Sequence, residues 1–156
     1  MHALSLESIL VVKQKSRFDS RKAGVTESLR ALWAYMDYLG NPDLQLVAFS
    51  GLETADAVIA DTGCKVHAIY MKKPAASTVD AWFKGSNHAS VAAANGDFTT
   101  FLVGTSGGGR EYCPIYADGL PMGTGFTVGS HTTVNGSVKS AAADAPTGFA
   151  IISAAL

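Results

Sequence analysis

The polar and apolar positions of the chain follow a helical period most clearly between Thr26 and Leu39. Thr26 suits the N-cap position, and Glu27 brings a negative charge into the first turn, where it favours the helix macrodipole. Gly40 stands where a left-handed C-terminal residue is expected, and Asn41-Pro42 prevents the helix from continuing. The sequence therefore predicts a helix whose apolar residues, spaced three and four apart, form one stripe: Leu29, Leu32, Trp33, Met36 and Leu39. We expect the rest of the domain, rather than another subunit, to cover this stripe.

From Leu44 onwards, short apolar and β-branched runs alternate with turn residues. In residues 79–84, apolar and other side chains alternate, which predicts a half-buried strand with Lys84 on its polar side. Turn signals such as Asp61-Thr62-Gly63, Gly107-Gly108-Gly109 and Asp118-Gly119 separate the runs. The predicted strands are residues 45–50, 57–60, 65–71, 78–84, 98–103, 111–117, 125–129 and 148–154.

These short strands, with no helical pattern between them, indicate a mainly β fold. A parallel sheet would need crossover helices, and the spacing leaves no room for them. The sequence predicts an antiparallel β-sandwich or jelly-roll-like domain over residues 45–156. An N-terminal arm and the one amphipathic helix make up residues 1–44.

Charge changes this picture, because the second half of the chain is almost uncharged. Residues 85–156 hold twelve of the sixteen glycines but six charged residues, namely Asp97, Arg110, Glu111, Asp118, Lys139 and Asp144. A solvated domain usually carries charge on about a quarter of its residues. The neutrality suggests that much of this surface lies against other proteins.

The first 22 residues are different, since they carry five basic and two acidic residues. Two interpretations stay open: a solvated lead-in, or a basic arm that lies on an acidic partner. The candidate partner-binding residues are Lys13, Lys15, Arg17, Arg21 and Lys22 in the arm, with Trp33 on the helix.

The net charge of −1 argues against general nucleic-acid binding. No run approaches the roughly 20 apolar residues of a membrane span, and residues 8–12 are too short for the core of a secretion signal. Cys64 and Cys113 are expected to be reduced, buried thiols of a protein made in a reducing cytoplasm, although they can pair if their strands are neighbours.

The search for chemistry finds no local signature. The histidines His2, His67, His88 and His131 show no metal-binding spacing, and Cys64 and His67 are expected on opposite faces of one strand. A nucleophilic Cys113 would need a distant histidine, whereas the following Pro114 more simply indicates an edge strand or a bulge.

The glycine-rich segments around Gly108 and Gly125 match neither phosphate-binding motif, so they are expected to be hairpins. The aromatic residues Trp82, Tyr112 and Tyr116 are candidates for a carbohydrate platform, but aromatic residues on strands more often belong to the core. We therefore predict no catalytic residue, no cofactor and no bound metal.

Two segments carry a resemblance to a known family. The run Asp118-Gly119-Leu120, then Gly125-Phe126-Thr127-Val128 and an apolar final strand at residues 149–152, resembles the end of small β-sandwich virion proteins of tailed bacteriophages. Residues 62–70 followed by residues 81–84 are similar to the opening hairpin of those proteins. The resemblance covers roughly residues 57–156 and leaves the arm and the helix outside it.

This resemblance implies a structural, non-enzymatic function. Such proteins commonly serve as capsid decoration (cement) proteins, which stabilise the phage head by bridging major capsid proteins. We therefore expect a homo-oligomer, a dimer or trimer, that is made in the host cytoplasm and located on the capsid surface. The alternatives are a receptor- or glycan-binding sandwich of a tail or fibre, a tail-tube or connector component, and a small hydrolase that uses Cys113.

Overall fold

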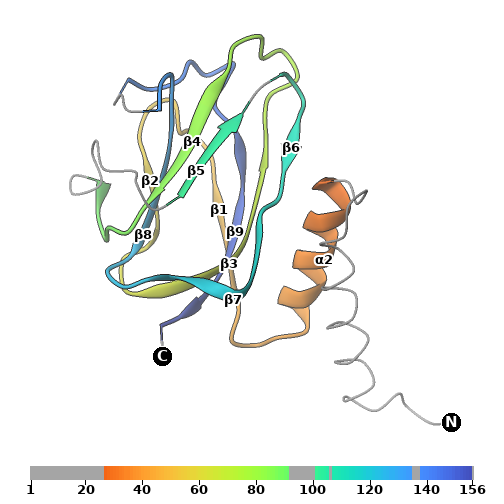
Figure 1. Ribbon diagram of the computed structural model, residues 1–156, viewed down its shortest axis with the longest axis vertical. Helices are drawn as coiled ribbons and strands as arrows, with labels where there is room; N and C mark the ends of the chain where they lie inside the picture. Colours follow the sequence, from red (N-terminus) through yellow and green to blue (C-terminus); the bar gives the residue numbers. More distant parts are fainter. Residues whose placement is uncertain (1–26, 92–100, 106, 135–137, 156) are drawn as a thin grey trace, which may run out of the picture.

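The computed structural model describes residues 27–91, 101–105, 107–134 and 138–155, with the backbone alone for residues 101–105. Helix α2 comes first in this part of the chain, and two antiparallel sheets follow (Figure 1). The elements are α2 (Glu27–Leu39), β1 (Gln45–Phe49), β2 (Ala57–Ala60), β3 (Cys64–Lys72), β4 (Ala81–Ser86), β5 (Phe101–Thr105), β6 (Glu111–Tyr112), β7 (Ile115–Met122), β8 (Phe126–His131) and β9 (Thr147–Ala154).

The two sheets pack face to face as a β-sandwich. The five-stranded sheet has the order β1-β9-β3, and both β6 and β7 pair with the far side of β3. The four-stranded sheet has the order β2-β8-β4-β5. Apolar side chains from both sheets fill the space between them, and the rings of Phe49 and Phe83 lie 5.3 Å apart across it. The predicted mainly β antiparallel sandwich with an N-terminal helix is confirmed.

Most predicted strands are present, and the main error concerns residues 111–117. This run divides into β6 and β7 at Cys113-Pro114, as the proline suggested. The Asp118-Gly119 turn signal is wrong, because β7 continues through it to Met122. Gly119 has a φ of 77° and lies on the edge of the sheet, where β7 pairs irregularly with β3. The residue therefore permits a bulge in the strand rather than a reversal of the chain.

The strand predicted at residues 78–84 begins only at Ala81, and Val79 before it is exposed. Lys84 is the larger correction, because its side chain is 1% exposed instead of facing water. The first residues of the strand predicted at 98–103 lie outside the described residues.

Helix α2 packs on the outer face of the five-stranded sheet, on the side that carries β6 (Figure 1). Its inner face consists of the small residues Ala31 and Ala34, with Tyr38 one turn further on. Ala34 and Tyr38 join a small apolar cluster with Leu44, Ala68, Ile115, Phe149 and Ile151. Alanine side chains let the helix backbone approach the sheet closely. Because Ala31 and Ala34 face the sheet, most of the predicted apolar stripe lies on the side of the helix that points away from it.

The helix ends without the left-handed glycine that the sequence predicts. Gly40 is not among the glycines with positive φ. Its N–H donates to the carbonyl of Met36, and the N–H of Asn41 donates to Tyr38 in a tighter last turn. Residues 40–44 then lead directly into β1.

Candidate functional site

The outward face of α2 carries five of the nine large apolar side chains that are exposed in the described part of the chain. Leu32 is 52% exposed and Leu39 64%, and the other exposed large apolar side chains of the helix are Leu29, Tyr35 and Met36. The expectation that the domain covers the stripe is therefore wrong for all of its residues except Trp33, which is half-buried. The reason is geometric, because the larger side chains lie on the face opposite Ala31 and Ala34, which contacts the sheet.

Polar contacts fix this helix to the sandwich at its first turn. A carboxylate oxygen of Glu27 accepts a hydrogen bond from the backbone N–H of Cys113 at 2.6 Å. The hydroxyl of Ser28 donates to the carboxylate of Glu111 on β6. Glu111 in turn lies 3.4 Å from the ammonium of Lys72 on β3. The helix is therefore attached to β6 and to the Cys113-Pro114 link after it, and its outward face has a fixed orientation.

The six predicted partner-binding residues have different outcomes. Trp33 lies on α2 and is half-buried. Lys13, Lys15, Arg17, Arg21 and Lys22 lie outside the described residues, so their role stays a prediction. The sequence indicated the outward apolar residues correctly as a stripe, but it gave no sign of which face the sheet would cover.

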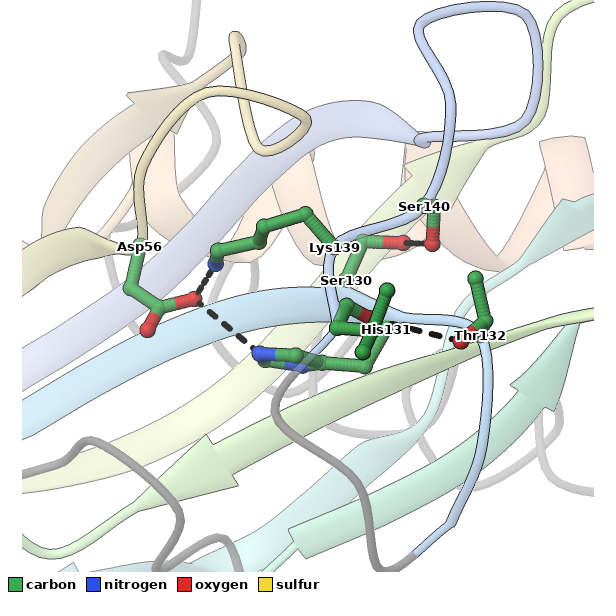
Figure 2. A network of polar contacts seen from close by, with 7 residues as sticks. Asp56, Ser130, His131, Thr132, Lys139 and Ser140 are labelled. Carbon is green, nitrogen blue, oxygen red and sulfur yellow. Dashed lines mark hydrogen bonds and ion pairs between the residues drawn. The ribbon is translucent and has the colours of Figure 1, made fainter.

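A second site is a buried polar cluster at one end of the four-stranded sheet (Figure 2). Asp56 precedes β2, His131 ends β8, and Lys139 lies eight residues after His131 in the chain. The Asp56 carboxylate forms an ion pair with Lys139, and its Oδ1 atom lies 3.8 Å from Nε2 of His131. The side chains of Asp56 and His131 are 4% and 1% exposed. Lys84 is also buried, on the strand β4 that pairs with β8.

Hydrogen bonds hold the segment that carries Lys139 along the end of β8. The N–H of Thr132 donates to Val138, and the N–H of Ser140 donates to Ser130. The hydroxyls of Ser130 and Ser140 lie 2.8 Å apart (Figure 2). The chain therefore folds back after His131 and brings Lys139 over the Asp56 carboxylate.

Gly129 makes room for the cluster. A Cβ atom at this position would lie 2.7 Å from Cε1 of His131, and it would also collide with the Asp56 carboxylate. This is a physical reason for one glycine of the glycine-rich run at residues 123–129. All of β8 is buried, so residues 126–129 belong to an internal strand, which confirms the strand predicted at residues 125–129 and not the flexible hairpin considered around Gly125.

Burial determines the protonation of the cluster. It lowers the pKa of His131 to about 4, and the neighbouring ammonium of Lys84 adds to this effect. Burial also lowers the pKa of Lys84, and it lowers the pKa of Lys139 to about 8 although Asp56 favours the charged form. At neutral pH the cluster combines an uncharged imidazole with a buried ion pair. An imidazole with a pKa near 4 is a weak general base at neutral pH, so the geometry favours a structural role.

The two cysteines are both buried and unpaired, as predicted. Cys113 lies under the first turn of α2, and burial together with the nearby Glu27 raises its pKa to about 12. A thiol with so high a pKa holds very little of the reactive thiolate. Of the two histidines considered for a nucleophilic site with Cys113, His131 belongs to the other sheet, whereas His67 lies on β3 with its Nε2 atom 2.8 Å from Oγ of Ser153.

The candidate carbohydrate platform is also not assembled. Trp82 lies on β4 of the four-stranded sheet, whereas Tyr112 and Tyr116 lie on β6 and β7 of the other sheet. Both tyrosines pack against the core. The Gly107-Gly108-Gly109 run forms a turn, in which Gly107 and Gly109 have positive φ and Gly108 lies against the carbonyls of the Ala75–Ser77 segment.

Two further observations concern metals and membranes. Among the described side chains, no group of three or more His, Cys, Asp or Glu residues is placed to hold a metal ion. None of the helices in the described ranges has the length and apolar character needed to cross a bilayer. The absence of a cofactor, a metal and catalysis stays a prediction.

Comparison with protein-family models, with curated proteins and with solved structures finds no match for this chain.

Proposed function

We propose that this chain is a structural virion protein of a tailed bacteriophage that decorates the capsid and stabilises it by bridging major capsid proteins. The outward apolar face of α2 is the observation that carries this proposal. Leu32 and Leu39 are more than half exposed, although a surface helix normally turns its largest apolar side chains toward its own domain. Such a face is suited to the groove of another protein.

The spacing of the exposed side chains supports this mode of attachment. Leu29, Leu32, Met36 and Leu39 stand at positions i, i+3, i+7 and i+10 of the helix. Helices that bind apolar grooves present anchors at this spacing. The contacts of Glu27 and Ser28 with the sandwich hold the helix in place before binding. Because the helix is already ordered, binding the partner then costs less conformational entropy.

The low charge of the sandwich and its resemblance to small virion proteins support the second half of the proposal. A surface with few charges can be covered by neighbouring proteins at a small desolvation cost. Many copies on one shell would add their individual contacts through avidity. The protein therefore needs a rigid body and an attachment face, and no chemistry of its own.

The test measures binding to capsid shells assembled from the major capsid protein of the same phage. We expect the wild-type chain to sediment with the shells and to raise their resistance to heat and osmotic shock. The double variant Leu32→Lys with Leu39→Lys should lose this binding, because two charges would have to be buried in the groove. Val79→Lys, at a site that is 56% exposed and away from the helix, is the matched control.

Circular dichroism and thermal unfolding should be the same for the wild type and for both variants, because all three altered side chains are exposed. Shells whose stability is unchanged by the wild-type chain would contradict the decoration function. Binding that survives the double helix variant would contradict the role of α2. A tail-tube or connector component would bind tail assemblies instead of shells.

A further inference from the structure

A second interaction surface lies at the edge of the five-stranded sheet. Strand β1 pairs with β9 over five residues without a register shift, from Gln45 opposite Ile152 to Phe49 opposite Gly148. Within the described residues, no strand pairs with the other side of β1. An open edge of this kind presents backbone N–H and C=O groups that can pair with another strand.

Natural edge strands are usually protected against such pairing, and β1 is not. Its sequence, Gln45–Phe49, contains no charge, no proline and no bulge. The opposite edge of the same sheet has all three kinds of protection, because β7 contains Asp118, Pro121 and the positive-φ Gly119 where its register shifts. The two edges of one sheet therefore differ in the features that prevent pairing.

The edge strands of the four-stranded sheet are less suited to pairing with a strand of another chain. Strand β2 has four residues, and its pairing with β8 shifts between Val58 and Ala60. The side chains of β5, at the other edge, lie outside the described set. Of the edges that the structure describes in full, β1 is the longest regular one without charges.

We propose that β1 pairs in antiparallel fashion with β1 of a second copy of this chain, about a two-fold axis at Val47. This register places Val47 opposite Val47, and Leu46 opposite Ala48. The lack of charge favours a second copy as the partner. A charged residue on β1 would lie close to the same residue of the second copy, and the two like charges would repel each other. Every facing pair in this register is uncharged.

The surroundings of β1 add contact area to this pairing. Gln45 and Ala48 are exposed, and Leu46 and Val47 are half-buried. A cavity of about 350 Å³ opens between the two sheets on the same side, lined among others by Gln45, Val58 and Ile152. Val58, at 39% exposure, is an apolar side chain on its wall. A second copy on this edge would cover part of it.

The expected dimer is weak and has a defined shape. Five residues of strand span about 17 Å, so the pairing covers less than the roughly 1,200 Å² of a stable interface. Association should therefore be reversible and depend on concentration. A two-fold axis perpendicular to the sheet leaves both α2 helices on the same face of the joined sheets, and both apolar faces would be available to one partner surface.

Sedimentation equilibrium of the purified chain over a range of concentrations tests this proposal. We expect a reversible monomer–dimer equilibrium. Ala48→Lys should weaken dimerisation at least tenfold, because the new charge lies at the pairing edge. Val79→Lys, which adds the same charge elsewhere, should leave it unchanged. A mixture of the Ala48→Lys and Leu46→Glu chains should associate again, because these positions face each other in the proposed register.

Hydrogen exchange of the β1 amides provides a second measurement that needs no variant. Their protection in the wild-type chain should rise with protein concentration. A chain that stays monomeric at its highest soluble concentration, or a dimer that is insensitive to Ala48→Lys, would overturn the proposal. Protection of β1 that appears only with capsid shells would also overturn it, since a strand of the shell would then be the partner. The shell-binding result for the helix variants does not depend on this outcome.

Discussion

Oδ1 of Asp56 lies 3.8 Å from Nε2 of His131, and both side chains are almost fully buried. The two residues are far apart in the sequence and come from a loop and from the end of an internal strand. Lys139 completes the contact by forming an ion pair with the same carboxylate. Charged side chains are rarely buried in folded proteins, so these groups should have a clear effect on stability.

The first prediction concerns acid pH. Above about pH 6.5 the His131 imidazole is neutral in both the folded and the unfolded chain. Between pH 6.5 and about 4 only the unfolded chain binds the proton, because the folded-state pKa is about 4. The free energy of unfolding should therefore fall as the pH falls through this window, by up to about 3 kcal/mol. Urea unfolding at several pH values measures this slope.

The variant that isolates this effect is His131→Gln. Its free energy of unfolding should depend less steeply on pH between 6.5 and 4 than that of the wild type, whatever its absolute stability. His88→Gln, at a half-buried site shortly after β4, is the matched control, because it removes a histidine outside the buried cluster. Equal slopes for the wild type and His131→Gln would show that His131 is not held neutral.

The second prediction concerns the buried ion pair. Asp56→Ala leaves the ammonium of Lys139 without its counter-charge and should cost about 3–5 kcal/mol. Combining Asp56→Ala with Lys139→Met should cost less than the sum of the two single changes. Lys72→Ala breaks the exposed pair with Glu111 and should cost less than about 1 kcal/mol. Strictly additive effects at Asp56 and Lys139 in chemical denaturation would contradict the pairing.

The third prediction compares two glycines of the same run. Gly129→Ala should destabilise the protein by about 3 kcal/mol, because its Cβ atom would collide with Asp56 and His131. Gly123→Ala should change stability by less than about 0.5 kcal/mol, because nothing lies within 4 Å of its Cβ position. Thermal unfolding of the two variants checks the difference. Similar melting temperatures for the two variants would mean that Asp56 and His131 can move aside to accommodate the added Cβ atom.

The fourth prediction concerns the thiols. Neither cysteine should react with a thiol reagent at about pH 8 while the protein is folded, because burial raises both pKa values. Both should react after unfolding in urea, which provides the internal control. A rapid reaction of one thiol in the folded protein, lost in Cys113→Ala but not in Cys64→Ala, would support the hydrolase alternative.

The strands could be predicted from the sequence because their signals are local. Turn residues and alternating apolar positions occur within a few residues of each other, and the strand at residues 57–60 was predicted at its observed bounds. The same local signals fail at Asp118-Gly119, because a glycine with positive φ serves a bulge as well as a turn. Which of the two forms depends on whether a partner strand continues alongside.

The orientation of α2 could not be predicted, because it depends on the shape of a distant surface. The apolar stripe was correct as a stripe, but Ala31 and Ala34 contact the sheet instead. The buried cluster was missed for a similar reason. Lys84 carries no local sign that it lies near the buried His131 of another strand, and the alternation of its own strand predicted exposure.

The short connection between α2 and β1 has a mechanical consequence. Residues 40–44 are a short connection held by backbone hydrogen bonds, and Leu44 is buried against the sheet. A force applied to the helix is therefore transmitted directly to β1. A load along the strand would stress the five β1–β9 residue pairs simultaneously, and they would have to break together. A load across the strand would open them one after another from Gln45. The force needed to separate β1 from β9 would then depend on the direction in which the force acts on the attached protein.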